Sequence, residues 1–198
     1  MRIRIFILIV TGFLLAGCQS LPIENPNDVK TGGGTANEWV TSKNNRIAIL
    51  YPSDINLKRL EGRLRSRWFS VSPAERDLYT NPSYSIEQRI ISRLEAILLR
   101  VEEILAMYPS SIDLKIKVFK NRRDLSLEYL SLLGTTQDYK SFYIHGLGTI
   151  YASMQDISDS VIAHEMAHAV IDNYFQVIPP EKTAELLATY VDSHLERE

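Results

Sequence analysis

The apolar residues from position 46 onward repeat with two different periods, and the shorter period predicts strands. A continuous apolar run at 47–51 ends at a proline and predicts one strand. Strict alternation of apolar and polar residues over 114–120 predicts a second strand with one face in the core. Two β-rich runs, 142–144 and 149–154, flank a short segment containing two glycines and predict a hairpin.

The longer, helical period appears between these runs, and several helix ends carry recognisable capping residues. Ser85 and Gln88 fit a capping box, Asn121 can cap the next helix, and Gly134 can close it. Helices are expected over about residues 57–68, 85–108, 122–133, 158–174 and 181–196. The order β-α-α-β-α-β-β-α-α predicts an α+β domain over 46–198, with its core at about 86–198.

Residues 1–17 have the pattern of a signal peptide, with two arginines before an apolar stretch at 5–15. The stretch ends Leu-Ala-Gly-Cys at Cys18, which resembles the lipobox of bacterial lipoproteins. This resemblance implies cleavage before Cys18, attachment of palmitate and other acyl chains, and a membrane anchor. The residue at position 19 is Gln19 rather than Asp, which in that family implies the outer membrane, with the protein facing the periplasm.

Residues 18–45 are rich in Pro, Gly and Asn and predict a flexible tether after the lipidated cysteine. The net charge of −2 and the absence of a clustered basic face argue against a nucleic-acid partner. Cys18 is the only cysteine, so no intramolecular disulfide can form.

The strongest chemical signal is His164-Glu165-Met166-Ala167-His168, which reads H-E-x-x-H within a predicted helix. Residues four apart lie on one helix face, so His164 and His168 can bind the same Zn²⁺. Glu165 stands where metallopeptidases place the general base that deprotonates the attacking water. The alternative, two core histidines and a paired glutamate, would require the burial of three polar groups without a strong partner.

Catalytic zinc usually has three protein ligands, so a third one is expected. A metzincin would have Gly at position 171 and His at position 174, where this chain has Ile171 and Tyr174. The following helix offers Glu185 within 184–190, Ala-Glu-Leu-Leu-Ala-Thr-Tyr. Glu181, one turn earlier, is the rival, although its place in the first turn also suits the helix dipole.

With this helix, the chain resembles the gluzincin metallopeptidases, especially small peptidase MA-like domains, over about residues 112–194. The resemblance implies a minimal zincin-like domain with a small, mostly antiparallel sheet, one Zn²⁺ per chain held by His164, His168 and Glu185, and Glu165 as the base. It also implies that the strand at 149–154 is a sheet edge to which a peptide substrate adds.

Two positions differ from the family pattern, and the donor for the oxyanion is open. Leu186 replaces a common Gly, and Thr189 stands where thermolysin-like enzymes have an Asp that orients the first His. Oxyanion stabilisation requires a further donor. The candidates are Tyr143, His145, Tyr151 and Tyr190, whereas His194 is expected to be an exposed residue at a helix end.

These features predict a lipid-anchored zinc metallopeptidase of the bacterial cell envelope that hydrolyses peptide or protein substrates. Two alternatives stay open: a non-catalytic pseudopeptidase that binds zinc or peptides, and a structural lipoprotein. The intact set of His164, Glu165, His168 and Glu185 favours the enzyme, because a binding domain has no need of Glu165.

Overall fold

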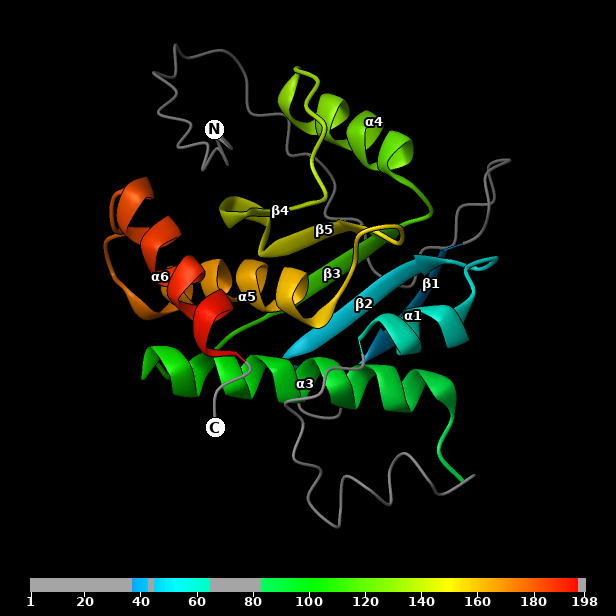
Figure 1. The fold of residues 1–198 in the computed structure, drawn as a ribbon, viewed down its shortest axis with the longest axis horizontal. Coiled ribbons are helices and arrows are strands. Elements are labelled where there is room, and N and C mark those ends of the chain that lie inside the picture. The colour runs from blue at the N-terminus through cyan, green and yellow to red at the C-terminus, as the bar shows by residue number, and fades with distance from the viewer. Residues whose placement is uncertain (1–36, 43–44, 65–82, 196–198) are drawn as a thin grey trace, which may run out of the picture.

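The computed structural model describes residues 37–42, 45–64 and 83–195, and its centre is a five-stranded sheet (Figure 1). The strand order is β1-β2-β3-β5-β4. β2 with β3 and β3 with β5 pair in parallel, whereas β1 with β2 and β4 with β5 pair antiparallel. The strands are β1 (Asn37–Thr41), β2 (Ile47–Pro52), β3 (Leu114–Phe119), β4 (Ser141–Ile144) and β5 (Thr149–Ser153).

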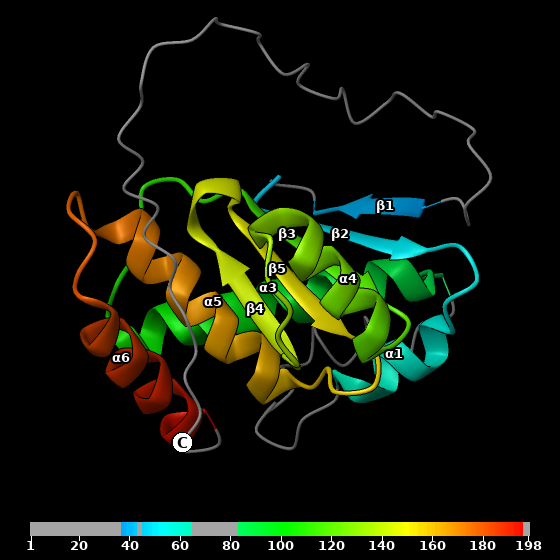
Figure 2. The same cartoon turned by 90° about the horizontal axis from the view of Figure 1, so that it is seen from above.

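The described part of the chain has five α-helices, distributed unequally over the two faces of the sheet (Figure 2). Residues of α1, α3, α5 and α6 share one large buried cluster with the strands, whereas α4 packs in a second cluster. The helices are α1 (Leu57–Arg63), α3 (Ile86–Leu105), α4 (Arg122–Leu133), α5 (Asp159–Tyr174) and α6 (Glu181–His194). A 3₁₀ turn, η1 (His145–Leu147), joins β4 to β5. None of the helices described is long and apolar enough to cross a membrane.

Alternation along β5 shows how the two clusters are separated. Ile150 and Ala152 lie in the large cluster with α3 and α5, whereas Tyr151 lies in the smaller cluster with α4. Successive side chains of a strand point to opposite faces, so α5 and α4 cover opposite faces of the sheet. The fold is therefore α+β, as the sequence predicts.

Helix boundaries follow the predicted capping residues closely. Ser85 and Gln88 form a reciprocal capping box at the start of α3. Asn121 caps α4, and Gly134 ends it in the left-handed conformation with φ of 70°. α1 and α3 are shorter than predicted: α1 ends at Arg63, and α3 ends at Leu105. The residue after α3, Ala106, has a left-handed backbone conformation and ends that helix. The polar stretch at 70–82, for which the sequence predicts a loop or a short irregular helix, lies outside the described residues.

Three expectations about the sheet and its boundaries are wrong. The sheet is mixed rather than mostly antiparallel, with two parallel and two antiparallel pairings. The strand at 149–154 is not an edge, because β5 lies between β3 and β4, and β4 is the edge beside it. Part of the predicted tether, residues 37–41, forms β1, which pairs with β2.

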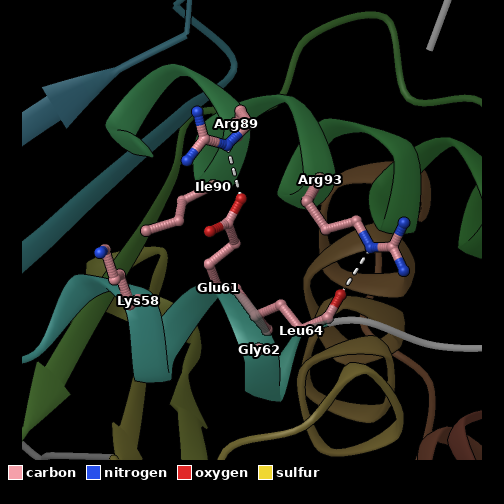
Figure 3. A pocket seen from close by; sticks show the side chains of 7 residues that line it. All are labelled: Lys58, Glu61, Gly62, Leu64, Arg89, Ile90 and Arg93. Carbon is pink, nitrogen blue, oxygen red and sulfur yellow. Dashed lines mark hydrogen bonds and ion pairs between the residues drawn. The ribbon is translucent and has the colours of Figure 1, made fainter. Parts of the chain in front are cut away.

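A buried arginine connects α1, α3 and the start of α5. Arg93 on α3 donates from Nε to the carbonyl oxygen of Leu64 at 2.5 Å, as Figure 3 shows. Its NH2 group lies 3.7 Å from the Asp159 carboxylate in the first turn of α5, and both side chains are buried. The arginine also lines a pocket of about 330 Å³ between α1 and α3. Arg93 on α3 thus contacts both the end of α1 and the first turn of α5.

Candidate metal centre

Helix α5 carries the H-E-x-x-H residues in the centre of the fold. Ser158 caps this helix by accepting a hydrogen bond from the backbone N–H of Val161. His164, Glu165 and His168 are each only 3–4% exposed, and the helix is buried along most of its length. Three polar side chains are therefore held in the interior, where each needs a partner for its charge or hydrogen-bonding atoms.

Helix α6 supplies the third group, and it is Glu185. One carboxylate oxygen of Glu185 lies 3.4 Å from His168 Nε2, and the other lies 3.8 Å from His164 Nε2. One ligand atom from each of these residues lies within 4.8 Å of the other two. Glu181 is exposed at the first residue of α6 and does not belong to this group. Of the two carboxylates considered from the sequence, the structure brings Glu185 to the histidines.

The chemistry of this group fits a zinc ion. His164 Nε2 is buried and has no hydrogen-bond partner among the described residues, although it faces Glu185. A lone pair on His164 Nε2 that faces the Glu185 carboxylate at 3.8 Å is unfavourable unless a proton or a cation lies between the two groups. Two imidazoles and one carboxylate are also a usual ligand set for catalytic zinc. His164, His168 and Glu185 are therefore suited to hold a metal ion.

Asp192 contacts the first histidine of the motif. In thermolysin-like enzymes an Asp at the position of Thr189 has this orienting role, and here Asp192 takes its place. His164 Nδ1 lies 2.8 Å from Asp192 Oδ2, so Nε2 is the nitrogen that faces Glu185. A carboxylate on the second ring nitrogen fixes the tautomer and raises the basicity of a metal-binding histidine. Asp192 follows Glu185 by two helical turns, so both lie on one face of α6. That spacing is the signal by which Asp192 could have been found.

Ser141 is a second residue of the site that sequence reasoning missed. Its hydroxyl donates a hydrogen bond of 2.7 Å to Glu165 Oε1, and both side chains are buried. Ser141 begins β4, so the edge strand contacts the proposed base directly. No local motif marks this serine, because the contact joins residues 24 positions apart.

The candidates on the hairpin make a separate polar cluster with Asp172. The hydroxyl of Tyr143 donates to Asp172 Oδ2 at 2.7 Å, and His145 Nδ1 lies beside the other oxygen of Asp172. Burial and this hydrogen bond raise the pKa of the Tyr143 hydroxyl well above its usual range. The Tyr143 hydroxyl thus donates its proton to Asp172, whereas the side chain of His145 is about half exposed.

The other two tyrosines do not point into the metal centre. Tyr151 lies in the cluster with α4, on the face of the sheet opposite α5, and burial raises its pKa to about 12. Tyr190 is exposed on α6 and stacks on His194, with ring centroids 3.9 Å apart. His145 is therefore the one candidate donor that lies on the α5 side and is exposed. Cys18, the predicted lipidation site, lies outside the described residues.

Comparison of the sequence with models of known protein families and with curated proteins gives no match.

Proposed function

We propose that this protein is a zinc-dependent peptidase of the bacterial cell envelope, built on a zincin-like domain. The observation that carries the proposal is the convergence of His164, His168 and Glu185 from two helices, with their ligand atoms within 4.8 Å. Glu165, next to the first histidine, adds a carboxylate that the metal set does not use. This combination is typical of sites that activate water for hydrolysis.

Each residue of the site has a distinct role in this proposal. When bound, zinc would polarise a peptide carbonyl and make water more acidic, with a pKa of about 7. His164 and His168 hold the metal, and the negative charge of Glu185 offsets part of the positive charge of the metal ion. Glu165 accepts a proton from the attacking water and returns it to the leaving amine. Asp192 keeps His164 in the tautomer that presents Nε2.

We place the substrate along β4 instead of β5. β4 is the sheet edge next to α5, and two of its side chains bond to carboxylates of that helix. An extended peptide can add to such an edge through backbone hydrogen bonds. A peptide bound in this way would run past Ser141, whose hydroxyl contacts Glu165.

The zinc affinity of three single variants tests the ligand set. Glu185→Gln is expected to weaken zinc binding more than about 100-fold, beyond the effect of an outer-shell change. Asp192→Asn is expected to weaken it about 10- to 100-fold, because His164 loses its orienting carboxylate. Glu181→Gln, the same change one turn before Glu185, is the matched control and should bind like wild type. Competition titration with a chelating dye measures all three, and equal affinities for Glu185→Gln and Glu181→Gln would refute the assignment.

The envelope location rests on the lipobox at Cys18. Cys18→Ser removes the sulfur to which the lipid would attach, so the protein is expected to leave the membrane fraction. Fractionation of cells that express the two forms, followed by immunodetection, measures the change. If Cys18→Ser stays with membranes as firmly as wild type, another segment anchors the protein.

A further inference from the structure

Side chains at alternate positions of β4, and that of the first residue of η1, join this edge of the sheet to α5. Ser141 contacts Glu165, whereas Tyr143 and His145 contact Asp172. Alternate residues of a strand share one face, and residues seven apart on a helix share another. These contacts therefore form a single polar seam, and its first member, Ser141, reaches the proposed base. Figure 2 shows β4 beside α5.

The Ser141 hydroxyl is rigidly placed within this seam. Ser141 pairs with Ala152 of β5, and the neighbouring Lys140 carbonyl oxygen accepts a hydrogen bond of 3.1 Å from the Ser153 N–H. Ser141 is 5% exposed and Glu165 is 3% exposed, so water competes little for their hydrogen bond. A hydrogen bond to a charged acceptor in such a setting is stronger than one at the surface.

A carboxylate has two oxygens, and Ser141 occupies one of them. Within the described residues, the Glu165 carboxylate accepts one hydrogen bond, from the Ser141 hydroxyl to Oε1. Fixing Oε1 restricts rotation of the carboxylate about its last side-chain bond, so the direction of Oε2 is also fixed. General-base catalysis depends on such placement, because the base must lie within hydrogen-bond reach of the proton that it accepts.

We propose that Ser141 is a positioning residue, which holds Glu165 Oε1 so that Oε2 faces the attacking water. This inference rests on the proposed function, since it concerns the base of the same reaction. In this role the Ser141 hydroxyl contacts Glu165 and neither metal nor substrate. The serine acts by restricting the conformations of Glu165, an effect that can also be observed in metal-free protein.

Two variants of Ser141 and one control separate this role from a structural one. Ser141→Ala is expected to lower kcat about 10- to 100-fold, the range for loss of an outer-shell partner, while KM and zinc content stay unchanged. Ser141→Thr keeps the hydroxyl and should recover most of kcat. Ser153→Ala removes a buried hydroxyl that accepts a hydrogen bond from Gln155 N in the turn after β5 instead of contacting Glu165, so it should leave kcat unchanged. An unchanged kcat in Ser141→Ala, or an equal loss in Ser153→Ala, would overturn the proposal.

A structural measurement tests Ser141 independently of activity. In crystal structures of the metal-free full chain, Glu165 is expected in one rotamer in wild type and Ser141→Thr, and in several in Ser141→Ala. A single unchanged rotamer in Ser141→Ala would overturn the positioning role. A wild-type protein that neither binds zinc nor cleaves peptides would refute the proposed function, while the rotamers would still decide whether Ser141 positions Glu165.

Discussion

Glu165→Gln is expected to abolish nearly all peptide hydrolysis while leaving the zinc site intact. The amide has the shape of the carboxylate and its oxygen can still accept the hydrogen bond from Ser141. It cannot accept a proton from water at neutral pH, so kcat should fall about 10²- to 10⁴-fold, the usual contribution of a general base. Because Glu165 lies outside the ligand set, zinc content should stay at one ion per chain. Steady-state kinetics and metal analysis on the same preparation measure both effects.

Glu181→Gln makes the same chemical change on α6 and provides the control for this experiment. Glu181 is exposed in the first turn of that helix, and its variant should keep wild-type kinetics. Hydrolysis by Glu165→Gln at the wild-type rate would show that another group accepts the proton. Loss of zinc from Glu165→Gln would place this residue among the ligands.

Removal of zinc is expected to lower the thermal stability of the protein substantially as well as its activity. The buried ring nitrogens of His164 and His168 lie near the carboxylate of Glu185. Without a cation between them, burial of these polar groups lowers the stability of the folded state. Free zinc at about 1,000 times its Kd would stabilise the folded state by about 4 kcal/mol. For a domain of this size, that corresponds to a rise in Tm of roughly 8–16 °C.

Calorimetry with a chelator, and then with added zinc, measures this stabilisation. Zinc should restore both Tm and hydrolysis, whereas magnesium should restore neither, because it prefers sites made wholly of oxygen ligands. A protein whose Tm is the same with chelator and with excess zinc would contradict the metal site. The two histidines would then be core residues of α5.

Local signals in the sequence were sufficient for most helices and for the three residues of the candidate metal site. The capping box at Ser85 and the N-cap at Asn121 are confirmed, because caps depend on residues three apart in the chain. Glu185 was preferred over Glu181 from its helical context, and the structure agrees. These features depend on helical periodicity, which a single sequence displays directly.

The sheet was predicted less well because strand pairing is not a local property. A short connection permits only an antiparallel pair, and the connections β4–β5 and β1–β2 are short. The long connections from β2 to β3 and from β3 to β5 allow parallel pairs, and both form. Connection length was thus the available signal against a mostly antiparallel sheet. β1 lacks a strong apolar pattern in its sequence, and residues 37–41 are recognised as a strand only from their pairing with β2.

The outer part of the site was missed for a similar reason. Asp192 shares a helix face with Glu185, but its partner His164 lies 28 residues earlier, on another helix. Ser141 and Asp172 likewise acquire their roles only when β4 lies against α5. Ligands that come from one helix are visible as a motif, whereas the groups that orient them depend on tertiary packing.

Cleavage of a mixed peptide library by the zinc-loaded protein tests the central claim most directly. Mass spectrometry should show new termini at internal peptide bonds, which disappear with a chelator and return when zinc is restored. A library that stays intact with protein carrying one zinc per chain would contradict the peptidase assignment. Retention of intact peptides on the immobilised protein would then identify a non-catalytic binding domain.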